Sequence, residues 1–150
     1  MITVKNNQRK IDIDQKKLVR DAQNVLDALR YSDFDLGILL TTNKTIRTLN
    51  RTYRHKDKPT DILSFPFHPT LKAGKRIKPT SDDEKNLGDL IISLEYVQKA
   101  AQELDTTFEK RMRILLVHGI CHLLGYDHIT DKEYAQMHRK ELALLKLLPK

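Results

Sequence analysis

The sequence of 150 residues predicts a domain of the α/β or α+β class, in which helices cover most of a sheet. Three observations lead to this prediction. Short apolar runs typical of strands alternate along the chain with longer stretches in which apolar residues recur at helical spacing. Residues that cap helices or form turns separate these patterns, and the sequence shows neither an internal repeat nor a domain boundary. A chain of this length buries about 70% of its unfolded surface as one domain, so we expect a single domain over residues 1–150.

The first half of the chain predicts strands and helices in alternation. Residues 2–4 begin as a strand, and the run DLGILLTT at 35–42 predicts a buried strand. The helix between them starts at Asp14, because aspartate is favoured at the N-cap. Its apolar positions, at helical spacing, are Leu18, Val19, Ala22, Val25, Leu26 and Leu29. A shorter helix is expected over about residues 43–53. Its apolar face comprises Ile46, Leu49 and Tyr53.

The second half begins with a strand predicted at 62–67. Pro66 limits this strand to an edge or an end of the sheet, because proline cannot donate a backbone hydrogen bond. Residues 68–86 carry two prolines, one glycine and many charges, so we expect a flexible loop there. A further strand is predicted at 88–93, and it runs into a helix capped by Ser93.

Two capping boxes predict the starts of the last two helices. Thr106-x-x-Glu109 opens a helix that stops at Gly125, the residue type that most often ends helices in the left-handed conformation. Thr130-x-x-Glu133 opens a final helix to about Leu148.

The composition indicates which classes of partner and which cellular compartment to expect. Lysine plus arginine outnumber aspartate plus glutamate by 27 to 20, which gives a formal net charge of +7. This excess favours a polyanionic partner such as RNA, DNA or an acidic membrane surface, although a basic protein without such a partner also fits it. The single cysteine, Cys121, excludes an internal disulfide framework and is typical of a reducing compartment. No signal peptide and no apolar run of roughly 18 to 20 residues is seen, so we expect a cytoplasmic protein.

The segment HGICHLLGYDH, residues 118–128, holds three of the six histidines. On a helix, His118 and His122 lie about 40° apart around the axis and about 6 Å apart along it, so both can reach one point. If the helix continued, His128 would lie about 9 Å further along the axis, too far to share an ion. Gly125 permits the chain to turn back. The spacing HxxxHxxGxxH therefore predicts a three-histidine metal site, with histidines that only pack or hydrogen-bond as the alternative.

The ligand set indicates the metal and the type of site. Three neutral imidazoles without a thiolate suit Zn²⁺ best, with Ni²⁺, Cu²⁺ or Co²⁺ as alternatives. Three protein ligands leave one tetrahedral position open, which is the pattern of catalytic zinc sites. Cys121 points about 100° away from His122 on the helix, so we expect it in the core. The spacing resembles that of metzincin proteases, but Gly119 stands where those enzymes carry their glutamate base. Asp127 is a candidate base, although orienting an imidazole or capping the turn is the role that we favour.

A strip of cations precedes the predicted edge strand. The strip comprises Lys44, Arg47, Arg51, Arg54, Lys56 and Lys58. The first four share one helical face, and the strip is either a solvated surface or a set of RNA phosphate contacts, with Lys44, Arg47, Arg51, Lys56 and Lys58 as candidate RNA-binding residues. Arg54 is the candidate for action at the scissile group. It ends the helix beside a turn, and a guanidinium can stabilise charge on a phosphorane-like transition state.

These segments resemble the YbeY family of bacterial endoribonucleases, which are linked to ribosomal RNA maturation. The family signature HGxLHLxGYDH is matched by HGICHLLGYDH except that Cys121 replaces a leucine. The blocks LNRTYRHKDKPTDILSFPF and LGDLIIS resemble the other two family motifs. The blocks occur in the expected order, and the likeness covers nearly the whole chain.

The resemblance implies a small α+β domain with helices against a mixed sheet of about four strands. It implies a metal-dependent endoribonuclease for single-stranded RNA, with His118, His122 and His128 as ligands of one zinc ion and Arg54 as the charged residue required for activity. The expected role is ribosomal RNA processing, including the 3′ end of 16S rRNA, and ribosome quality control. Ribosomal particles are expected as partners, with no DNA and no membrane. Two alternatives stay open, an RNA-associated assembly factor with a structural metal and a metallohydrolase of peptides or small molecules.

Overall fold

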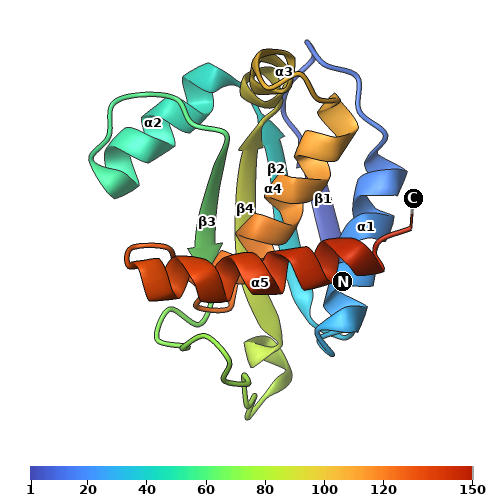
Figure 1. The fold of residues 1–150 in the computed structure, drawn as a ribbon, viewed down its shortest axis with the longest axis vertical. Helices are drawn as coiled ribbons and strands as arrows, with labels where there is room; N and C mark the ends of the chain where they lie inside the picture. The colour runs from blue at the N-terminus through green and yellow to red at the C-terminus, as the bar shows by residue number, and fades with distance from the viewer. Residues whose placement is uncertain (150) are drawn as a thin grey trace.

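The computed structural model describes residues 1–149, and its helices and strands alternate through most of the chain (Figure 1). In chain order they are β1 (Ile2–Asn6), α1 (Gln15–Ala28), β2 (Asp35–Thr41), α2 (Asn43–Arg54), β3 (Ile62–Pro66), the 3-10 turn η1 (Asp82–Glu84), β4 (Asn86–Ser93), α3 (Leu94–Glu103), α4 (Phe108–Leu123) and α5 (Asp131–Leu147). Within residues 1–149, no helix has the length and apolar character that a membrane crossing requires.

The four strands form one mixed sheet in the order β1-β2-β4-β3. The β1–β2 and β2–β4 pairs are parallel, whereas β3 pairs with β4 in the antiparallel direction. This arrangement confirms the α+β class with a four-stranded mixed sheet. It also confirms that the strand containing Pro66 lies at an edge, where proline's missing N–H interrupts no second ladder.

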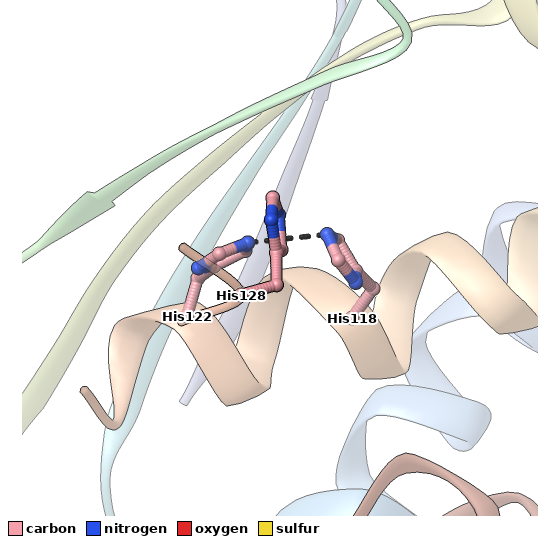
Figure 2. Close-up of side chains that lie close together, drawn as sticks. All are labelled: His118, His122 and His128. Carbon is pink, nitrogen blue, oxygen red and sulfur yellow. Dashed lines mark hydrogen bonds between the residues drawn. The ribbon is translucent and has the colours of Figure 1, made fainter. Parts of the chain in front are cut away.

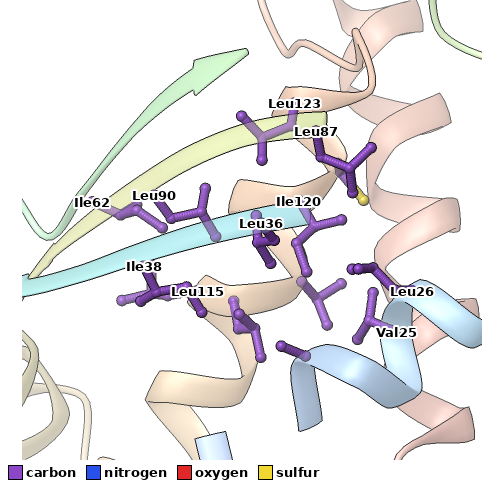
Figure 3. Close-up of a cluster of buried hydrophobic side chains, with 14 of the residues drawn as sticks. Val25, Leu26, Leu36, Ile38, Ile62, Leu87, Leu90, Leu115, Ile120 and Leu123 are labelled. Carbon is purple, nitrogen blue, oxygen red and sulfur yellow. The ribbon is translucent and has the colours of Figure 1, made fainter. Parts of the chain in front are cut away.

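One face of the sheet carries the hydrophobic core. Leu36, Ile38 and Leu40 alternate along β2 and are buried, and they pack in a cluster with residues of α1 and α4 (Figure 3). Helix α4 lies very close to the strands because Gly119 has no side chain. A Cβ atom at this position would stand 2.7 Å from Ile62 Cδ1 and 2.8 Å from Leu90 Cδ2. Helix α5 crosses in front of the sheet and packs on α4 (Figure 1).

The other face of the sheet is hollowed and largely uncovered. Leu39, Ile91 and Phe65 project onto it from three strands and are only half-buried. They line a shallow cavity of about 700 Å³ that we call the sheet-face hollow. Leu49 and Tyr53 of α2 complete its wall on the side of β3.

One of the two predicted capping boxes is wrong. The side chain that caps α4 belongs to Thr107, whose oxygen accepts the N–H of Lys110 at 3.1 Å. Thr106 is used in the preceding turn, where its N–H bonds to the carbonyl of Ala101 at 3.0 Å and so ends α3. The box at Thr130 is confirmed, because its two reciprocal bonds with Glu133 are both formed.

Most of residues 68–86 form the predicted loop, with η1 near its end and Asn86 already in β4, and the loop is anchored to the core rather than detached from it. The Arg76 guanidinium donates to the carbonyls of Leu29 and Arg30 at 2.6 and 2.9 Å and lies 4.0 Å above the ring of Tyr31. Ile77 is buried against the same end of α1. Arg76 therefore ties the loop to the end of α1.

Candidate metal centre

His118 and His122 lie one turn apart on α4, and His128 reaches them from the chain that follows. The three rings gather on one side of α4 (Figure 2). The Nε2 atoms of His118 and His122 are 3.1 Å apart, and one potential ligand nitrogen from each ring lies within 4.8 Å of the others. Two nitrogens bound to one tetrahedral zinc ion lie roughly 3.3 Å apart when each bond is about 2.0–2.1 Å long. His118 and His122 therefore already lie at the spacing of two zinc ligands, and His128 is close enough for the three rings to hold one ion.

The chain reversal at Gly125 creates this convergence. Gly125 has φ of +90°, a left-handed conformation that a residue with a Cβ atom adopts only with strain. Its N–H bonds to the His122 carbonyl and the Tyr126 N–H bonds to the Cys121 carbonyl, both at 3.1 Å, as in a Schellman cap. A Cβ atom on Gly125 would also collide with the backbone carbonyl of Leu71. Both the conformation and the close approach of the 68–86 loop therefore require glycine.

The protonation states of the rings suit a metal. Burial lowers the pKa of His122, and the neighbouring His118 and His128 lower it further, so the imidazole is neutral at pH 7 and offers a lone pair. The Nδ1 of His118 lies 2.9 Å from the Glu141 carboxylate of α5. Because the carboxylate accepts, Nδ1 carries the proton and Nε2 faces the cluster with its lone pair. The donor set thus fits a borderline-soft divalent ion such as zinc.

The cluster opens into a cleft of about 560 Å³ between α4, β3 and the end of α2. Arg54, the last residue of α2, lines this cleft together with the three histidines. Its side chain is exposed and has no ion-pair or hydrogen-bond partner in the part of the chain that the structure describes. Ser64 of β3 lines the cleft as well. A free guanidinium and a metal-binding cluster thus face the same space.

The sequence profile of a family described as Endoribonuclease YbeY matches residues 3–149. The chain belongs to this family. The YbeY resemblance of the three sequence blocks is thereby confirmed.

Individual YbeY relatives span almost the same length. Endoribonuclease YbeY of Homo sapiens is 40% identical over 144 residues, which cover 96% of this chain and 86% of the human one. Endoribonuclease YbeY of Aquifex aeolicus is 41% identical, over 93% of this chain and 85% of its own. The solution structure of TM1509 from Thermotoga maritima is 25% identical, with a TM-score of 0.64 over 98% of this chain and 88% of that one. The fold and the sequence therefore agree on the YbeY family.

Gly119 shows why this YbeY chain lacks the glutamate of metzincin proteases. The residue after His118 faces the sheet, where even a Cβ atom would meet Ile62 and Leu90. A glutamate at this position cannot point toward the metal cleft without separating α4 from the strands.

Two further residues near the histidines have structural roles. Cys121 is fully buried, and burial raises the pKa of its thiol to about 12, so it stays protonated and is a poor metal ligand. Asp127 lines the cleft, but its carboxylate accepts the backbone N–H of His128 at 2.8 Å. This bond holds the turn that carries the third histidine.

The rest of the cationic strip lies outside the metal cleft. Arg47 Nε donates to Asp57 at 2.9 Å, and Arg51 lies 3.9 Å from the same carboxylate. Hydrogen bonding from Arg47 lowers the pKa of Asp57. The remaining three strip residues, Lys44, Lys56 and Lys58, are exposed and do not line the cleft. Of the six predicted cations, the structure brings only Arg54 to the histidines.

Glu141 is a site residue that the sequence reasoning missed. It lies on α5, 23 positions from His118, and no local spacing connects the two. Carboxylates that accept from a ligating histidine orient its ring and increase its basicity. No sequence signal could have found Glu141, because its partial burial beside His118 appears only in the folded structure.

Replacing Glu141 is expected to weaken metal binding without unfolding the protein. We expect Glu141→Ala to lower zinc affinity by about 10- to 100-fold, since the His118 N–H loses its acceptor, and Glu141→Gln to lower it less. Competition with a chromophoric zinc chelator measures the affinity. Glu103→Gln, at an exposed position at the end of α3, is the matched control. Equal zinc affinity in Glu141→Ala and the unmodified protein would contradict an orienting role.

Proposed function

We propose that this YbeY protein is a zinc-dependent endoribonuclease that cuts single-stranded RNA during ribosomal RNA maturation. The observation that supports it most is the shared cleft of three converging imidazoles and one unpaired guanidinium. The proposal extends to the 3′ end of 16S rRNA, to ribosome quality control, to ribosomal particles as partners without DNA, and to the cytoplasm, where ribosomes are assembled. Membership of the YbeY endoribonuclease family supports RNA as the substrate class.

The histidines and Arg54 have different roles in phosphodiester hydrolysis. His118, His122 and His128 hold the ion, and the open side of the cleft admits a phosphate and a water molecule. When bound, zinc supplies Lewis-acid activation of a phosphoryl oxygen and of water. Arg54 stabilises the negative charge that grows on the phosphoryl oxygens as the P–O bond breaks. Its guanidinium remains charged at all physiological pH values, so it can perform this role throughout.

The structure offers an argument against each of the two alternative functions, and one experiment separates the endoribonuclease from a peptidase. A peptide hydrolase would need a general base, and the packing of Gly119 on the sheet removes the position that metzincins use. An assembly factor with a structural metal would normally fill all four coordination positions, whereas the cluster in residues 1–149 contains three ligand side chains. Competition for the site by RNA but not by peptides would separate the endoribonuclease from a peptidase.

Metal removal tests the proposed function. Chelation is expected to reduce cleavage of an unstructured RNA oligonucleotide by about 10³-fold or more, because the ion supplies several kcal/mol of transition-state stabilisation. Stoichiometric Zn²⁺ should restore cleavage, and metal analysis of the purified protein should find one ion per chain. Undiminished cleavage by fully metal-free protein would overturn the proposal, and so would an absence of cleavage by the zinc-loaded protein.

A further inference from the structure

An exposed aromatic pair lies where α2 meets β3. The rings of Tyr53 and Phe65 pack edge to face, with centroids 5.3 Å apart and an interplanar angle of 74°. Phe65 is half-buried, and Tyr53 is 63% exposed. The sequence pattern placed Tyr53 on the apolar face of its helix with Ile46 and Leu49. Ile46 is buried and Leu49 half-buried, but the Tyr53 ring lies largely in solvent, so packing alone does not account for it.

The pair stands on the border between two hollows. Tyr53 and Phe65 line the sheet-face hollow, whereas their neighbours in the chain, Arg54, Ser64 and Pro66, line the metal cleft. The edge strand β3 and the end of α2 therefore separate the two spaces, and α2 lies beside one end of β3 (Figure 1). A single-stranded RNA that leaves the metal cleft past Arg54 would therefore reach the aromatic pair next.

Charged side chains line both sides of this border. On the cleft side, Arg54 has no ion-pair partner in the described residues, whereas Asp61 pairs with Arg111 at 3.5 Å and Asp127 accepts the N–H of His128. In the sheet-face hollow, Asp35 pairs with the amino group of Met1 at 2.8 Å and Lys5 lies on the same face, but Asp89 is exposed and pairs in register with Phe65. Beside the aromatic pair, the Asp89 carboxylate therefore disfavours a phosphate, but it can accept a hydrogen bond from the amino group of an uncharged base. A phosphate thus fits the Arg54 side, and a base fits the Tyr53 side.

We propose that the exposed ring of Tyr53, held edge to face against Phe65, forms a stacking platform for one unpaired nucleobase next to the phosphate held at Arg54. The proposal rests on the proposed function, in which single-stranded RNA is the substrate. Exposed aromatic rings beside a cationic path are the usual way in which proteins hold unpaired bases, because every base has a π-face. A base that is paired within a duplex cannot turn onto the rings. The platform therefore gives the enzyme a physical reason to prefer single strands.

Binding of RNA to the zinc-loaded protein tests the platform, with the signal read before a measurable fraction of the RNA is cleaved. Fluorescence anisotropy compares a labelled single-stranded oligonucleotide with a blunt duplex of the same sequence. We expect Tyr53→Ala to weaken binding of the single strand by about 5- to 150-fold, the range for loss of one base–aromatic stack, and to leave duplex binding unchanged. Tyr53→Phe keeps the ring and should bind like the unmodified protein. Tyr134→Ala removes a tyrosine of α5 that is similarly exposed, at 57%, and should have no effect.

An abasic scan locates the base. Oligonucleotides that lack one base in turn should include a position whose loss weakens binding to the unmodified protein but not to Tyr53→Ala. Unchanged single-strand binding by Tyr53→Ala would overturn the platform and leave the sheet-face hollow as a surface for a protein partner. Equal weakening for single strand and duplex would also overturn it, because the substitution would then act through Arg54. If the unmodified protein binds neither RNA, the proposed function fails rather than the platform alone.

Discussion

Replacing His122 with alanine is expected to remove the metal ion and nearly all RNA cleavage. His122 is one of only two ligand candidates fixed on the rigid helix α4, and its Nε2 lies 3.1 Å from that of His118. Two remaining imidazoles, one of them on a turn, cannot hold an ion with comparable affinity. We expect zinc content to fall from one ion per chain toward zero and the cleavage rate to fall by about 10³-fold or more.

The matched control is His138→Ala. His138 is an exposed histidine of α5 that stacks on Tyr134, with ring centroids 5.7 Å apart. It should keep both zinc and cleavage. Elemental analysis and a time course of oligonucleotide cleavage measure the two effects. A His122→Ala protein that retains one zinc ion per chain would show that the three rings do not form the site.

Replacing Arg54 with alanine is expected to separate catalysis from metal binding. Arg54 is exposed and lines the cleft without touching a carboxylate in the described residues, so its loss should change neither zinc content nor thermal stability. Cleavage should fall by about 10²- to 10³-fold, the usual cost of removing one group that stabilises transition-state charge. Arg54→Lys should recover little of the rate, since an ammonium cannot reproduce the planar fork of a guanidinium.

Arg51→Ala provides the comparison for Arg54. Arg51 lies three residues before Arg54 on α2, is also exposed, and faces Asp57 at 3.9 Å instead of the metal cleft. We expect its loss to lower the cleavage rate by no more than a few-fold, through weaker binding of RNA phosphates. Single-turnover cleavage at saturating RNA distinguishes the two residues. If both variants lost activity equally, Arg54 would be only one more binding cation.

The parts of the site that the sequence predicted are those encoded locally. His118 and His122 one turn apart, followed by the chain reversal at Gly125, fix the convergence within eleven residues of chain. The placement of Arg54 in the metal cleft needs the fold, because the α2–β3 segment meets α4 only in the folded chain, where β3 pairs with β4 and packs directly against α4. The resemblance to the YbeY motifs nevertheless indicated that Arg54 acts together with the three histidines.

The features that the sequence missed depend on contacts between distant segments. The bond between His118 and Glu141 joins two helices, and the steric demand on Gly119 comes from β3 and β4. The strip of cations was visible as a pattern, but its partial neutralisation by Asp57 depends on how the turn after α2 folds back. The Thr106 capping box failed for a similar reason, since the N–H of Thr106 closes the previous helix.

The hydrogen bond between Glu141 and His118 links the histidine cluster to α5. Any ligand that binds only the folded chain stabilises whatever elements its site requires. Here those elements include α5, which contributes no coordinating atom and yet holds one of the imidazoles in place. We therefore expect ion binding to stabilise α5 together with the histidine cluster, and metal removal to lower the stability of both.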